Sequence, residues 1–88
     1  MRTDKTLDLD FKFNKIAGEV IREKRIKANM SLNDVASRTR TTRQNIHKYE
    51  ISESRLKVDM FISICYAIHC NPQDVFDEIN ERVKNTKI

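Results

Sequence analysis

The spacing of apolar residues changes near residue 14 of the chain. Residues 7–13 alternate strictly between apolar and polar side chains, which is the period of a β-strand. This alternation predicts an extended, strand-like arm over residues 1–14. A single strand cannot pair with itself, so the arm would need a second chain or the edge of its own domain. A flexible arm that packs loosely beside the first helix is the alternative interpretation.

From residue 15 onward the apolar residues recur at helical spacing, which predicts five helices and an all-α fold. Three polar residues are predicted to cap helix starts, namely Ser31, Thr42 and Asn71. Asp34 stands three residues after Ser31, the spacing of a capping box. The predicted helices cover residues 15–28, 32–39, 43–50, 58–68 and 72–84. A single domain over residues 15–84 is expected, followed by a tail at 85–88.

The predicted helices each carry an apolar stripe that indicates the buried face. In the third helix Ile46 and Tyr49 are expected to face inward, with polar and basic residues on the outside. In the fourth helix the stripe is predicted to consist of Val58, Phe61, Ile62, Cys65 and Ile68.

Charge is distributed unevenly along the 88 residues, whose net charge is +4. Residues 14–58 carry eleven basic and five acidic residues, whereas residues 59–88 carry three basic and five acidic ones. A cationic half beside a mildly acidic half is typical of a protein with one face on a phosphate backbone. No apolar stretch approaches the length of a membrane span, and aspartates interrupt the N-terminal segment. A soluble, cytoplasmic protein is therefore expected, with no membrane partner.

Residues 31–50 are predicted to form a helix, a tight turn and a second helix with a polar, cationic outer face. That arrangement is the helix-turn-helix plan, in which the second helix enters the major groove of DNA. Arginine can bind guanine with two hydrogen bonds, and glutamine or asparagine can bind adenine in the same way. The residues predicted to read bases are Arg43, Gln44 and Asn45, with His47 and Lys48 one turn later.

Residues 16–79 resemble the lambda-repressor-like (Cro/CI, XRE) helix-turn-helix family of transcriptional regulators. The stretches that carry the resemblance are Gly18–Arg22, Ser31–Ala36, Thr42–Ile46, Lys48–Glu50 and Ile64–Val75. The chain departs from the family at Arg40 and Ser52, which stand where glycine is frequent. A left-handed backbone at Arg40 would cost an L-residue about 1–2 kcal/mol, so a slightly different turn is expected there.

The resemblance implies a five-helix domain that binds double-stranded operator DNA, usually as a two-fold homodimer. It implies an internal ion pair between Arg25 and Glu50, which would hold the reading helix against the rest of the domain. It also implies contacts to the DNA backbone near the start of the second helix and in the loop after the third. The residues expected to make backbone contacts are Asn33, Thr42, Arg55 and Lys57.

Neither a metal site nor an enzyme active site is predicted. Cys65, His69 and Cys70 lie close in sequence but lack the paired spacing of zinc modules. Both cysteines are expected to be small core residues. The chain shows no nucleophile–base set and no glycine-rich phosphate loop, so we expect neither catalysis nor a cofactor.

These observations favour a dimeric repressor that reads a pseudo-palindrome with half-sites about one helical turn apart. The alternative is a partner-binding regulator, such as an antitoxin or adaptor, whose DNA binding is secondary to capture of a protein. RNA binding is a third hypothesis, which the scarcity of aromatic residues disfavours. The arm and the fifth helix should separate the first two hypotheses, because their apolar faces would close on a second copy only in a homodimer.

Overall fold

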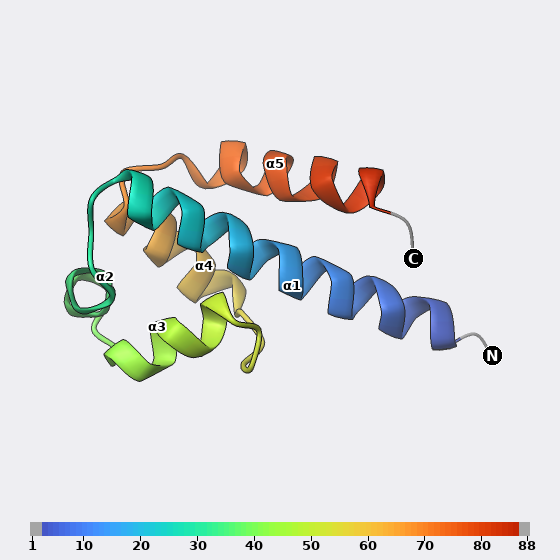
Figure 1. Cartoon of the computed structure of the whole chain (residues 1–88), viewed down its shortest axis with the longest axis horizontal. Coiled ribbons are helices and arrows are strands. Elements are labelled where there is room, and N and C mark those ends of the chain that lie inside the picture. The colour runs from blue at the N-terminus through green and yellow to red at the C-terminus, as the bar shows by residue number, and fades with distance from the viewer. Residues whose placement is uncertain (1–2, 87–88) are drawn as a thin grey trace.

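The computed structural model describes the backbone of residues 3–86 and the side chains of residues 11–86. In this part of the chain the secondary structure is entirely helical (Figure 1). The five helices are α1 (Thr3–Lys27), α2 (Leu32–Arg38), α3 (Arg43–Glu50), α4 (Val58–Ala67) and α5 (Pro72–Asn85). The all-α, five-helix fold predicted from the sequence is therefore confirmed. None of these helices is both long enough and apolar enough to cross a membrane.

The prediction of a strand-like arm is wrong for the described residues, because α1 begins at Thr3 and continues without a break to Lys27. Residues 1–2 of the predicted arm lie outside the described residues. Figure 1 shows the first part of α1 projecting beyond the end of α5. The Phe13 ring packs against the Phe76 ring of α5, with ring centroids 5.8 Å apart. Phe13, Ile16 and Val20 lie three and four residues apart, so a helix places them on one side, where Ile16 and Val20 are buried and Phe13 is partly buried.

Side-chain caps fix where α2 and α5 begin. Ser31 Oγ accepts a hydrogen bond from the Asp34 backbone N–H at 3.0 Å, and the Ser31 backbone N–H donates to Asp34 Oδ2 at 2.9 Å. This is the predicted capping box of α2. The Asn71 side chain accepts from the backbone of Gln73, and Pro72 follows it in the first turn of α5. Each cap satisfies backbone donors that a helix start leaves unpaired.

Two adjoining groups of buried residues hold the helices together. The first lies between α1, α2, α3 and α4, and its most buried large side chains are Ile21, Val35, Ile46, Ile64 and Ile68. The second joins α1 to α4 and α5 through Ala17, Val20, Cys65, Val75 and Ile79. Both groups use α1, so this helix is the element on which α3 and α5 are positioned.

The buried face of α4 differs from the predicted stripe. Cys65 and Ile68 are buried as expected, but Val58 is 76% exposed and Ile62 is 38% exposed. Ile64, which the predicted stripe omitted, is fully buried instead. The apolar residues of α4 are spread over nearly all sides of the helix, so their spacing in the sequence does not decide which side faces the core.

An ion-pair network ties α5 to α1 on the surface. Arg82 donates to both carboxylate oxygens of Glu23, at 2.8 and 3.2 Å, and to Glu78 at 2.7 Å. Lys24 lies 2.8 Å from the second oxygen of Glu78. The hydrogen bond from Arg82 lowers the pKa of Glu23 below its usual 4.5, and the hydrogen bond from Lys24 does the same for Glu78.

This network should make part of the stability pH-dependent. A carboxyl whose pKa is lower in the folded state contributes stability that is complete above its unfolded pKa and is lost as the pH falls through the folded value. We therefore expect the wild type to lose stability as the pH falls below the 4.5 of the unfolded Glu23 and Glu78. The loss should be below about 1 kcal/mol per pair, because these side chains are partly exposed.

Urea unfolding of the wild type and of Arg82→Gln, measured at about pH 7 and about pH 3, tests this expectation. The variant lacks the charge that is the main cause of the lowered Glu23 pKa and a smaller cause of the lowered Glu78 pKa, so its stability should fall less between the two pH values. Equal losses in the two proteins would contradict a contribution of the network.

Candidate nucleic-acid interface

A tight connection joins α2 to α3. Its left-handed residue is Arg40, with φ 57°. The Thr41 backbone N–H donates to the Ala36 carbonyl at 3.0 Å, which closes the end of α2. The turn therefore keeps the left-handed geometry that glycine would adopt, rather than changing shape to suit Arg40. Ser52, the second residue at a position where glycine is frequent, is also left-handed, with φ 65°.

The outer face of α3 carries the predicted base-reading residues. Arg43, Gln44 and Asn45, in the first turn, are all exposed. His47 and Lys48 are exposed one turn further along. Between them Ile46 is fully buried and so fixes the rotation of the helix about its axis. The five side chains cover the solvent-exposed side of α3, the part of its circumference that does not pack on the core, and we call this surface the α3 face.

Two hydrogen bonds order the start of α3. Thr42 Oγ1 accepts from the Asn45 backbone N–H at 3.1 Å and caps the helix as predicted. The Asn45 side-chain amide donates to Thr41 Oγ1 at 2.8 Å. This bond uses the amide nitrogen of Asn45 and orients its side chain, while the amide oxygen takes no part in it and can still accept a hydrogen bond.

An ion pair links the end of α3 to α1. Arg25 Nε donates to Glu50 Oε2 at 2.6 Å and Arg25 Nη2 donates to Glu50 Oε1 at 3.1 Å. The Arg25 side chain is 11% exposed and the Glu50 side chain is 2% exposed. Arg25 Nη1 also donates to the Met30 carbonyl at 2.8 Å, in the connection before α2. One guanidinium therefore joins α1, the start of the helix-turn-helix and the end of α3 with planar, two-point geometry.

Gly18 is the point of closest approach between α1 and α3. A Cβ atom at this position would lie 2.6 Å from the backbone oxygens of both Tyr49 and Glu50. Only a residue without a side chain lets the end of α3 lie directly on α1. In the sequence, Gly18 contributed only to the family resemblance, and its packing role was not predicted. A single glycine inside a helical pattern costs about 1 kcal/mol relative to alanine, and this cost could have indicated that the position needs a residue without a side chain.

Asn14 of α1 holds the loop that follows α3, a role that the sequence did not reveal. Its Oδ1 accepts from the Leu56 backbone N–H at 3.2 Å, and its backbone carbonyl accepts from Ser52 Oγ at 3.3 Å. This loop contains Arg55 and ends at Lys57, the residue that precedes α4. Both side chains are exposed.

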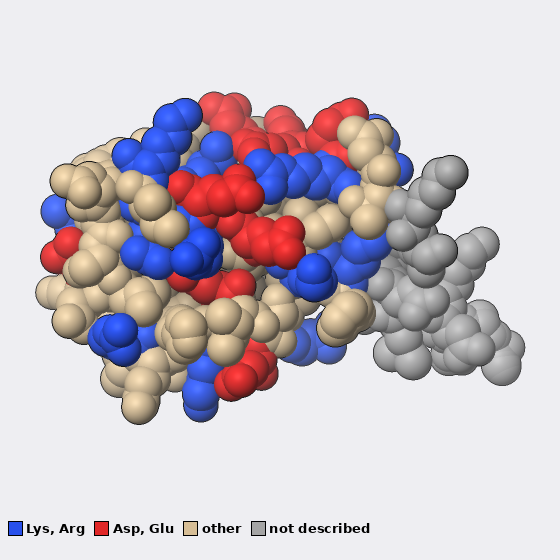
Figure 2. Space-filling model, in the orientation of Figure 1, with Lys and Arg blue, Asp and Glu red and all other residues tan. Residues whose placement is uncertain are grey.

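The remaining predicted backbone-contact residue, Asn33, is exposed in the first turn of α2. Thr42 is exposed at the start of α3. Asn33 and Thr42 therefore belong to the helix starts of the helix-turn-helix, whereas Arg55 and Lys57 flank the other end of α3. In Figure 2 most acidic side chains lie along α5 and the adjoining part of α1, away from the edge formed by α3.

Cys65 is buried in the core as predicted, whereas Cys70 is only partly buried. Burial raises the pKa of the Cys65 thiol to about 12, so it stays protonated and unreactive. Among the residues described, no three histidine, cysteine or acidic side chains are grouped closely enough to hold a metal ion.

Comparisons with known proteins agree with this geometry. A family model described as helix-turn-helix matches residues 21–75. Among solved structures, the crystal structure of the clp gene regulator ClgR from C. glutamicum superposes with a TM-score of 0.74. The sequence identity is 18%, over 80% of this chain and 91% of that chain, so the likeness concerns the fold. No curated protein matched the sequence significantly.

Proposed function

We propose that this chain, which belongs to the Cro/CI/XRE-type helix-turn-helix family, is a repressor that reads operator DNA through the α3 face. Membership of the family supports a non-enzymatic, DNA-binding transcriptional regulator. The repressor activity and the use of α3 in the major groove are the further parts of the proposal. A regulator of this kind would act in the cytoplasm, where the DNA is.

The observation that carries the proposal is the composition and exposure of the first turn of α3. Arg43, Gln44 and Asn45 are consecutive and exposed, and all three have fork-shaped polar ends. Such side chains can make two hydrogen bonds to one base edge in the major groove. Asn45 is a poorer helix former than alanine, lysine or glutamate, so helix formation alone does not favour it at this position.

The scaffold supports base reading because it fixes α3 in position and orientation. Arg25 and Glu50 hold its C-terminal end, the close contact at Gly18 sets its distance from α1, and Thr42 caps its start. Asn33 and Thr42 are exposed at the starts of α2 and α3, and Arg55 and Lys57 are exposed in the loop after α3. Contacts from these positions to phosphates would set the register of the helix in the groove.

We further propose that the active form is a homodimer on a pseudo-palindromic operator. One α3 spans only part of a groove and can read only a few base pairs. Two copies related by a two-fold axis would place their reading helices in successive major-groove turns, with half-sites about 34 Å apart.

Alanine substitutions on the α3 face should change specificity rather than affinity alone. For Arg43→Ala, Gln44→Ala and Asn45→Ala we expect a loss of discrimination of about 1–3 kcal/mol, each at a different base pair of the half-site. The measurement is fluorescence anisotropy with an operator recovered by selection and a panel of its single base-pair variants.

Lys57→Ala is the matched control, since its side chain makes no capping hydrogen bond to α4 and its expected partner is phosphate. This variant should bind every duplex in the panel more weakly by a similar factor and lower the salt slope by about 1. If the three α3 variants behaved like Lys57→Ala, with equal losses on all sequences, base reading by α3 would be refuted.

A further inference from the structure

Among the described residues, four that are not glycine hold a left-handed backbone: Asn29, Arg40, Ser52 and His69. Their φ angles lie between 57° and 65°. This conformation is costly for an L-residue, because its Cβ atom comes too close to the following carbonyl oxygen. A residue that keeps it in place of glycine therefore needs a tolerant side chain or an interaction that offsets the cost.

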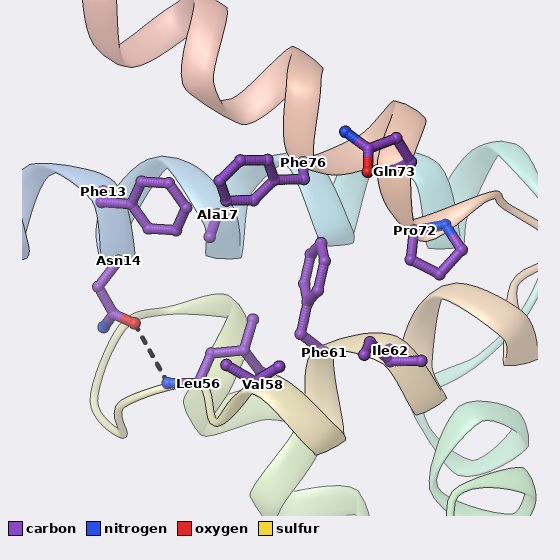
Figure 3. A pocket seen from close by; sticks show the side chains of 10 residues that line it. All are labelled: Phe13, Asn14, Ala17, Leu56, Val58, Phe61, Ile62, Pro72, Gln73 and Phe76. Atoms are coloured by element: carbon purple, nitrogen blue, oxygen red, sulfur yellow. Dashed lines mark hydrogen bonds between the residues drawn. The ribbon is translucent and has the colours of Figure 1, made fainter.

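Three of these four positions have such an explanation. Asn29 and His69 belong to the residue types that are enriched in the left-handed region. Ser52 Oγ donates to the Asn14 backbone carbonyl at 3.3 Å, so its side chain ties the loop after α3 to α1. Asn14 Oδ1 also accepts from the Leu56 backbone N–H of this loop (Figure 3). The cost at the fourth position is not offset in either way.

Arg40 is the left-handed residue whose side chain has no polar partner within the described part of the chain. Its side chain is exposed and makes no hydrogen bond or ion pair there. Glycine, which is frequent at this position in the family, would adopt the same turn readily. The turn thus carries a long cationic side chain at a costly position, and no polar contact inside the described protein accounts for it.

The stretch of chain around Arg40 carries only positive charge. Residues 35–49 include four basic residues and no aspartate or glutamate, although the chain has 13 acidic residues. The other three basic residues are Arg38, Arg43 and Lys48, and all three are exposed. Their mutual repulsion is not relieved by an acidic residue of this stretch, so an external anion would be attracted there. A guanidinium binds phosphate through two parallel hydrogen bonds, which makes phosphate a suitable anion.

The α2–α3 turn holds Arg40 beside the α3 face. The next residue, Thr41, donates its backbone N–H to the Ala36 carbonyl at 3.0 Å. Thr41 Oγ1 accepts a hydrogen bond from the Asn45 side chain at 2.8 Å, which links the turn to a predicted base-reading residue. In the helix-turn-helix plan the first helix crosses the DNA backbone and the start of the second reaches base edges. The turn that carries Arg40 lies between these two contacts.

We propose that Arg40 binds a phosphate of the operator backbone next to the base pairs that α3 reads. The inference rests on the proposed function and adds a positioning residue to it, since a phosphate contact sets the register of the helix without reading sequence. Glycine at this position would form the turn but not the contact. The residues expected from the sequence to contact the backbone did not include Arg40; they were Asn33, Thr42, Arg55 and Lys57.

Binding of Arg40→Gly to an operator recovered by selection, followed by fluorescence anisotropy at several salt concentrations, tests the proposal. Each phosphate contact contributes about 0.9 to the slope of log affinity against log salt, so the slope should fall by about this amount for each bound chain. The affinity should fall about fivefold for each bound chain at about 0.15 M salt. Because glycine suits the turn, the variant should unfold at the same urea concentration as the wild type or a higher one.

Lys84→Gln is the matched control for the loss of a positive charge. Lys84 is exposed on α5, which Figure 1 shows on the other side of α1 from α3, so this variant should keep the wild-type salt slope. Arg40→Lys should also keep the slope, because it retains the charge that displaces a counterion. An unchanged slope for Arg40→Gly, or a loss confined to one base pair of the operator, would overturn the contact.

The discrimination of Arg43→Ala between base pairs separates this proposal from the proposed function. If Arg40→Gly bound like the wild type while Arg43→Ala lost discrimination, the phosphate contact would be refuted and base reading would stand. If Arg40→Gly lowered the salt slope while Arg43→Ala discriminated like the wild type, base reading by Arg43 would be refuted and the phosphate contact would stand.

Discussion

Glu50→Ala is expected to lower the free energy of unfolding by about 3–5 kcal/mol, the usual cost of removing one partner from a buried ion pair. The substitution leaves the Arg25 guanidinium nearly buried, with the Met30 carbonyl as the acceptor that remains from its three hydrogen bonds. It also removes the link between the end of α3 and α1. Urea denaturation at neutral pH, followed by circular dichroism, measures the loss.

Glu53→Ala is the control for this experiment, because Glu53 is an exposed glutamate three residues further along. Its effect should stay within about 0.5 kcal/mol. Glu50→Gln should fall between the two, since the amide oxygen can still accept one hydrogen bond but carries no charge. Unchanged stability of Glu50→Ala would mean that the pair does not anchor α3.

Gly18→Ala is expected to destabilise the protein by about 1–3 kcal/mol, as is usual for overpacking of a close contact. The added methyl would lie 2.6 Å from two backbone oxygens at the end of α3, and backbone cannot move aside as a flexible side chain can. Helix propensity alone predicts the opposite sign, since alanine is favoured over glycine in a helix by about 0.8–1 kcal/mol. The sign of the measured change therefore decides between the two effects.

Arg22→Ala provides the comparison for Gly18→Ala, because it replaces an exposed residue one turn along the same helix. Its effect should be small, within about 0.5 kcal/mol. A more stable Gly18→Ala protein would show that α1 and α3 are not in the close contact described. We also expect Gly18→Ala to bind DNA more weakly than the wild type, because the added methyl displaces α3 and the helix then fits the major groove less well.

Local chemistry made much of the fold predictable. Ser31, Asp34, Thr42 and Asn71 each satisfy helix-start donors through bonds within a few residues, so their roles can be inferred from sequence alone. The outward face of α3 was predictable for a similar reason, since one buried residue, Ile46, fixes the rotation of a short helix.

What the sequence could not decide depended on contacts between distant segments. The alternation over residues 7–13 is compatible with strand or helix, and the helix is selected by packing such as that between Phe13 and Phe76. The rotation of α4 about its axis depends on which neighbouring helices cover it, because its own apolar residues are spread over nearly all of its sides. The exposed side chains Val58 and Ile62 were therefore assigned to the core.

Selection of bound sequences from a random duplex library, at near-physiological salt, tests the central claim most directly. The wild type and the double variant Arg43→Ala/Gln44→Ala should be carried through the selection in parallel. The account predicts a palindromic consensus for the wild type that disappears in the double variant. Enrichment of no sequence, or equal weak binding by both proteins, would contradict sequence reading by α3 and would favour a regulator that acts by capturing a protein partner.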